Sequence, residues 1–148
     1  PSSGDNNMNL ENGSLPVLDY LYLECYERLP GGSILSIVRM ARSLRHLSLQ
    51  YDICHTEWVS IAKCCPQLRT LSVSTYNLSD AGVLIFAQCL NHLQFLKLEY
   101  CQQLTDLSLV HIATHCEELR TFSLLHCPRV TPSALVELQE SLQQHHSP

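Results

Sequence analysis

The stretch Leu93–Cys116, "LQFLKLEYCQQLTDLSLVHIATHC", changes its apolar periodicity half-way along. Its first part places Leu96 and Leu98 at alternate positions, which is the spacing of a half-buried strand. Its second part carries apolar or small side chains at the spacing of one helix face, at Leu109, Ile112, Ala113 and Cys116. The stretch therefore predicts a strand, a turn and a helix within a single short unit.

This unit recurs along the chain. The pattern Leu-x-x-Leu-x-Leu, with Val or Phe as variants, starts at Leu18, Leu44, Leu68, Leu93 and Leu119, so the starts are 24 to 26 residues apart. The helical half recurs with it, and the last unit differs only by carrying Gln139 where the others are apolar. A period of this length lies in the range of leucine-rich repeats, and a polar substitution is expected of a terminal repeat.

Stacking explains why such units need one another. A lone unit cannot bury both its strand leucines and its helix stripe, whereas neighbouring units cover both. The sequence therefore predicts an α/β fold, a right-handed leucine-rich-repeat solenoid of about five strand–helix repeats with a parallel sheet on the concave side. We expect the repeat domain to span residues 15–144, residues 1–14 to be disordered or a tag or linker, and residues 145–148 to be a disordered tail.

Composition narrows the classes of function. The chain has 148 residues and a net charge of −5, which argues against a nucleic-acid partner. No stretch approaches the roughly 20 apolar residues of a membrane span, and no signal peptide is visible at the start. Eight cysteines in a secreted domain would be expected to pair. Because nothing else points to secretion, we expect free thiols and a cytoplasmic or nuclear location.

The unit from Leu93 to Cys101, followed by "QQLTDLSLVHIATHCEEL", resembles the cysteine-containing class of leucine-rich repeat that is typical of F-box/leucine-rich-repeat proteins. The segments "LLHCPRVTPSAL" and "TYNLSDAGVLIFAQCLNHL" show the same pattern, so the resemblance covers about residues 18–142. It implies that Cys101 and Cys127, at the ninth position of their units, bond to the backbone of the turn. It also implies that the repeats capture a protein substrate for ubiquitination, while a separate F-box docks the ligase adaptor. No F-box of about forty residues fits before Leu18, so we expect the adaptor to bind only through an F-box absent from this chain.

The cysteines and histidines also permit a metal hypothesis. The candidate ligands are Cys64, Cys65, Cys89, His115 and Cys116. However, they recur at the repeat period, which packing alone explains, and no Cys-x-x-Cys pair supports a tetrahedral site. We therefore expect no metal and no cofactor, while the roles of Cys25 and Cys54 stay open. No catalytic motif with a nucleophile, phosphate loop or metal-binding helix is present, so we expect no enzyme and name no catalytic residue.

The remaining candidate is the outward face of the sheet. Side chains on either side of the middle leucine of each unit point away from the core. The predicted partner-binding residues on this concave face are Tyr20, Tyr22, His46, Tyr51, Phe95, Lys97, Glu99 and Tyr100. A second stripe, Arg45, Arg69 and Arg120, is a possible site for an acidic or phosphorylated partner, although a solvated rim explains it as well.

Two classes of function follow. The first is a protein-interaction module that forms the substrate-recognition repeats of an F-box-type ubiquitin ligase subunit. The second is a leucine-rich-repeat scaffold or assembly factor unrelated to ubiquitination. An F-box in a longer form of the protein would distinguish them.

Overall fold

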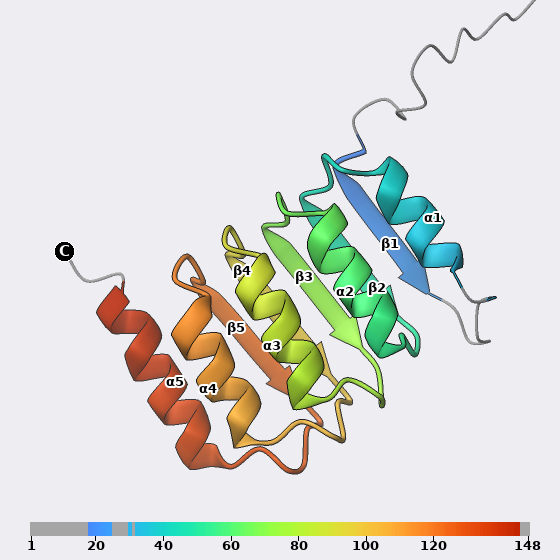
Figure 1. The fold of residues 1–148 in the computed structure, drawn as a ribbon. Helices are drawn as coiled ribbons and strands as arrows, with labels where there is room; N and C mark the ends of the chain where they lie inside the picture. Colours follow the sequence, from blue (N-terminus) through green and yellow to red (C-terminus); the bar gives the residue numbers. More distant parts are fainter. Residues whose placement is uncertain (1–17, 25–29, 31, 146–148) are drawn as a thin grey trace, which may run out of the picture.

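The computed structural model describes residues 18–24, 30 and 32–145, and these form five strand–helix units in sequence order (Figure 1). The strands are β1 (Tyr20–Glu24), β2 (His46–Gln50), β3 (Thr70–Ser74), β4 (Phe95–Glu99) and β5 (Thr121–Leu125). The helices are α1 (Ser33–Met40), α2 (His55–Cys64), α3 (Asp80–Cys89), α4 (Asp106–His115) and α5 (Pro132–His145). Each strand pairs in parallel with its neighbours in the sequence, in the order β1-β2-β3-β4-β5.

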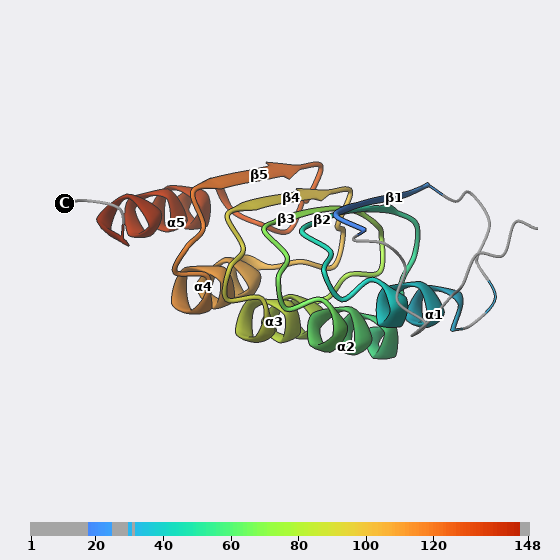
Figure 2. The same ribbon diagram turned by 90° about the horizontal axis from the view of Figure 1, so that it is seen from above.

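The sheet lines one side of the molecule and helices α1 to α4 run in a row along the other, while α5 lies at the end of the array, beside β5 and α4 (Figure 2). This is the predicted α/β repeat fold. The predicted disordered segment 1–14 lies outside the described residues, as do residues 146–148. Helix α5 continues through His145, one residue beyond the predicted end of the domain. No helix in the described part of the chain combines the length and apolar character needed to cross a membrane.

The strand leucines form the core between the two layers. Equivalent positions pair in register, so that Leu47, Leu71 and Leu96 lie side by side and are buried. Strands β2, β3 and β4 alternate buried with half-buried or exposed residues, as their period-2 pattern predicts. The terminal strands β1 and β5 are covered less well, because each has a neighbour on one side only.

Helices α2 and α3 meet through an aromatic contact that has a glycine beside it. The indole of Trp58 is buried against Phe86, with ring centroids 5.9 Å apart. Gly82 lies beside this contact, and a Cβ added there would stand 2.8 Å from Leu78 Cδ1 and 3.6 Å from Trp58 Cδ1. A larger residue at this position would therefore require the Leu78 side chain to shift, whereas its distance from Trp58 is an ordinary van der Waals contact.

A ladder of hydrogen bonds joins the start of one helix to the start of the next. The Asp80 carboxylate, at the start of α3, accepts from the Thr105 backbone N–H at 2.9 Å, the Thr105 hydroxyl at 2.6 Å and the Ser108 hydroxyl. Asp106, at the start of α4, accepts from the N–H and hydroxyl of Thr131 at 2.7 and 2.9 Å. The short motif Thr/Ser-Asp therefore fixes the stacking of units as well as capping helices.

Candidate protein-binding surface

The outward face of the sheet carries the two predicted columns of side chains. Each residue lies beside its counterpart in the next strand. One column is Tyr20, His46, Thr70, Phe95 and Thr121, and the other is Tyr22, Ser48, Ser72, Lys97 and Ser123. The strand register that was predicted from the repeats is therefore correct, and these side chains are half-buried or exposed.

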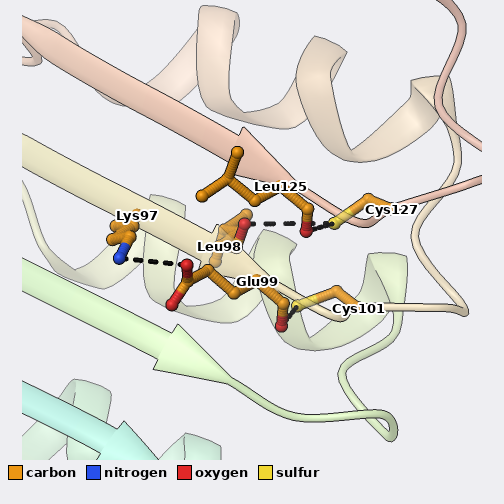
Figure 3. Close-up of polar contacts among 6 residues, drawn as sticks. All are labelled: Lys97, Leu98, Glu99, Cys101, Leu125 and Cys127. Carbon is orange, nitrogen blue, oxygen red and sulfur yellow. Dashed lines mark hydrogen bonds and ion pairs between the residues drawn. The ribbon is translucent and has the colours of Figure 1, made fainter.

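Local contacts hold the larger groups of this face in place. The rings of Tyr20 and His46 lie 6.0 Å apart across β1 and β2. The Tyr22 hydroxyl donates to the Glu24 carboxylate at 2.9 Å. On β4, Lys97 Nζ lies 3.0 Å from the Glu99 carboxylate. Figure 3 draws this ion pair. The face thus presents two exposed tyrosines at one end and an ion pair beside the half-buried ring of Phe95 nearer the other.

The predicted arginine stripe lies at the amino ends of the strands. Arg45, Arg69 and Arg120 are all exposed and occupy the same position of their units. Arg45 is within 3.6 Å of the Asp19 carboxylate, and this pair is about half exposed. An exposed ion pair of this kind contributes little to stability, and binding of an acidic ligand by the stripe stays a prediction.

The chain makes the same kind of turn after β4 and after β5. Tyr100 and His126, the residues after each strand, have left-handed backbones with φ of 56° and 54°. This turn directs the following cysteine inward. The Cys101 thiol donates to the Glu99 carbonyl at 3.3 Å and the Cys127 thiol to the Leu125 carbonyl at 3.4 Å (Figure 3). Both cysteines thus bond to the turn backbone as the resemblance implied.

The ends of β2 and β3 turn in another way, and this overturns one predicted site residue. Tyr51 is only 7% exposed and belongs to the core, so its assignment to the binding face was wrong. At the same position of the next unit, Thr75 is also buried, and its hydroxyl donates to the Asp52 carboxylate at 2.8 Å. The same carboxylate accepts from the Tyr76 backbone N–H at 3.2 Å. In this turn the Asp52 carboxylate accepts the hydrogen bonds from the solvent side, so no cysteine has to point into the core. The residue before the ninth position, Tyr51 or Thr75, is buried instead.

The two kinds of turn together place three rings in a row. Tyr76 and Tyr100 are 54% and 43% exposed, with ring centroids 6.4 Å apart. Tyr100 stacks on exposed His126 at 4.7 Å and an interplanar angle of 12°. We call these three residues the aromatic ridge. Sequence reasoning assigned Tyr100 to the binding surface but missed Tyr76, although the lack of a cysteine at the ninth position of that unit was a usable signal.

The surroundings raise the pKa of three of the described thiols, whereas the hydrogen bond with the Cys101 thiol lowers the pKa of Cys127 to about 7. All seven described cysteines are free, and in the part of the chain that the structure describes no group of three or more histidines, cysteines or acidic residues is arranged to hold a metal ion. Burial raises the pKa of Cys65 to about 11 and of Cys116 to about 12. The neighbouring Cys127 thiol and burial likewise raise the pKa of Cys101. These thiols are therefore protonated at neutral pH and poor nucleophiles.

Comparison with known proteins supports the repeat fold. No family model matches the chain. It is 36% identical over 86 residues to the F-box protein FBW2 of Arabidopsis thaliana, a match that covers 58% of this chain and 27% of that protein. The chain thus spans only about a quarter of that relative's length. Among solved structures, it resembles the tropomodulin C-terminal domain of Caenorhabditis elegans, with a TM-score of 0.62 and 15% identity over 87% of this chain and 84% of that one. The second likeness shows a shared fold and nothing more.

Proposed function

We propose that this chain is a protein-interaction module whose binding site is the outward face of the sheet. The observation that carries the proposal is the contrast between the two faces of each strand. The inward residues, such as Leu96 and Leu98, are fully buried, whereas the outward positions hold Tyr20, Tyr22 and Lys97, which the packing of the solenoid does not require. Aromatic side chains interspersed with charge are typical of residues that dominate binding energy at interfaces.

The more specific proposal is that these repeats recognise the substrate of an F-box-type ubiquitin ligase subunit. The match to an F-box protein over 86 residues supports this assignment, because most of the matched residues of this chain belong to its repeats. The adaptor of the ligase would then be bound by an F-box outside this chain. On this proposal the chain performs no catalysis, needs no cofactor and acts in the cytoplasm or nucleus.

The alternative is a scaffold unrelated to ubiquitination. The likeness to a tropomodulin domain supports the alternative no further than the fold, since the same architecture serves many partners. Both proposals place the partner on the same surface. They differ in whether the bound protein becomes ubiquitinated.

Affinity capture from cell extract with surface variants tests the site. Phe95→Ala and Lys97→Glu should each reduce recovery of the partner through about tenfold weaker binding, or about 1.4 kcal/mol. Lys63→Glu, on the exposed side of α2, is the matched control and should bind as the unaltered chain does. A partner lost with Lys63→Glu and retained by the other two variants would place the site on the helices instead.

Capture also separates the two function classes. If the ubiquitin proposal is right, depletion from cells of the ligase subunit that contains these repeats should lengthen the lifetime of the captured partner. Overexpression of this chain alone should have the same effect, because it would occupy the substrate without presenting it to the ligase. A partner whose lifetime is unchanged in both experiments would favour the scaffold.

A further inference from the structure

The aromatic ridge is a second feature of the binding surface, distinct from the columns at the middle of the strands. It follows the carboxyl ends of β3, β4 and β5 and brings together Tyr76, Tyr100 and His126 by the ring contacts described above. None of the three rings is needed to fill the core, since all three residues are exposed.

The backbone under the ridge is unusual for the residues that occupy it. A left-handed conformation favours glycine or asparagine, yet Tyr100 and His126 hold it at φ of 56° and 54°. The inward turn of Cys101 and Cys127 explains the conformation. It does not explain why two large rings stand there, because a glycine would make the same turn with less strain.

Negative charge lies beside the ridge. Asp52 is exposed and holds the Tyr76 backbone N–H with Oδ1, while its Oδ2 accepts no hydrogen bond from the described residues. Glu24 and Glu99 end two of the strands. Lys97 is the single lysine or arginine within β1–β5, and it is already paired with Glu99. The carboxylates nearest the ridge are therefore those of Asp52 and Glu99, of which Glu99 is paired with Lys97, and one exposed cation, Arg129, follows β5.

Stacked aromatic faces beside carboxylates fit a cationic, planar side chain. We propose that the aromatic ridge binds an arginine of the partner protein, with the guanidinium stacked on Tyr76 or Tyr100 and paired with the free oxygen of Asp52. Arginine suits this site better than lysine because its planar group stacks on rings and forms directed hydrogen bonds to a carboxylate at the same time. This inference rests on the proposed function and specifies the chemistry of the segment that the surface recognises.

Nuclear magnetic resonance titration of the ¹⁵N-labelled chain tests the proposal. The probe is an acetylated ten-residue peptide with two arginines separated by glycine and serine. Matched peptides replace each arginine by citrulline, which keeps the shape and loses the charge, or by glutamate. The arginine peptide should shift the amide signals of Tyr76, Tyr100 and His126 and bind at least fivefold more tightly than the citrulline peptide. Added salt should weaken it.

Variants locate the effect. Tyr100→Asn keeps a residue that tolerates the left-handed turn while removing the ring, and it should weaken the arginine peptide about two- to fivefold, the range of an exposed cation–π contact. Asp52→Asn should abolish the preference for arginine over citrulline. Lys63→Ala removes an exposed side chain of α2, on the helix side of the molecule, and should leave the affinity for the arginine peptide unchanged. Unchanged amide dispersion in each variant shows that the fold is intact.

The outcomes separate this inference from the proposed function. Equal binding of the arginine and citrulline peptides, no shift at millimolar peptide, or full affinity in Tyr100→Asn would overturn the ridge as an arginine site. A cellular partner lost with Phe95→Ala and retained by Tyr100→Asn would overturn it too, while leaving the sheet face as the binding site. Arginine binding at the ridge without any partner that depends on Phe95 would support the ridge and count against the wider surface.

Discussion

Removal of the Asp80 carboxylate should destabilise the joint between the third and fourth units. Asp80→Ala leaves the Thr105 N–H and hydroxyl without their acceptor and orphans the Ser108 hydroxyl, which is fully buried. A hydrogen bond to a charged group contributes about 1.5–3 kcal/mol, but Asp80 is half-buried and water can reach part of the site, so the three bonds are not additive. We expect a loss of about 2–3 kcal/mol in the free energy of unfolding.

Asp106→Ala is the matched control. Asp106 also begins a helix, so both variants lose the same favourable contact with the helix dipole. It accepts two hydrogen bonds, from Thr131, which is exposed, and no buried hydroxyl depends on it among the described residues. Its removal should cost about 1 kcal/mol, and the difference between the variants isolates the buried Ser108 hydroxyl.

Urea unfolding followed by the fluorescence of Trp58, the single tryptophan of the chain, measures both variants. With a slope of about 2 kcal/mol per molar urea, Asp80→Ala should lower the midpoint by about 1–1.5 M. Helical circular dichroism should report the same midpoint if the units unfold together.

The pH dependence provides a further check. Burial acts to raise the pKa of Asp80, but the hydrogen bonds from Ser108 and Thr105 outweigh it and hold the pKa below the usual 3.8. A carboxyl group whose pKa is lower in the folded state stabilises the fold above its unfolded pKa, and this contribution disappears as the pH falls through the folded value. The gap between the unaltered chain and Asp80→Ala should therefore be largest near pH 7 and narrow below pH 3.8. Equal midpoints for the two alanine variants, or a gap that does not depend on pH, would refute this reasoning.

Three other substitution or labelling experiments test the packing. Tyr51→Ala should cost about 3–5 kcal/mol as a buried aromatic, whereas Tyr100→Ala at the equivalent position should cost less than about 1 kcal/mol; similar losses in thermal unfolding would contradict the two kinds of turn. Leu96→Ala should lower the free energy of unfolding by about 2–5 kcal/mol, and a urea midpoint close to that of the unaltered chain would show that the strand register is wrong. Exposed Cys54 should react with a thiol reagent within the native state, while Cys116, whose pKa burial raises to about 12, should react only on unfolding; mass spectrometry of peptides labelled before and after denaturation decides between them.

The regular part of the fold could be predicted because the same apolar spacing occurs five times. A single strand such as Phe95–Glu99 is too short to identify alone, but its alignment with four others fixed both its extent and its register. Leu96 and Lys97 were assigned to opposite faces on this basis, and they lie on opposite faces.

The strand ends could not be predicted in the same way, because they depend on a contact between units. The burial of Tyr51 follows from the turn that Asp52 closes with Thr75 and Tyr76 of the next unit. Strand alternation places Tyr51 inward, in agreement with its burial, but it would place Tyr100 inward as well, and Tyr100 is exposed because its backbone is left-handed. The apolar pattern of one unit does not show which of the two turns forms. That depends on the residue at the ninth position and on the residues of the next unit that it contacts.

The Thr105–Asp106 dipeptide has a consequence for how such a chain can grow. Thr105 donates hydrogen bonds to the unit before it, and Asp106 accepts hydrogen bonds from the unit after it. The donor and the acceptor by which this unit joins its two neighbours are therefore encoded by adjacent codons. A tandem duplication of this unit would copy the donor and the acceptor together, and the new unit would fit its parents at once. In the last unit Pro132 stands where the acceptor would be. A duplication of that unit would produce a copy whose threonine has no carboxylate to donate to until a further mutation replaces the proline.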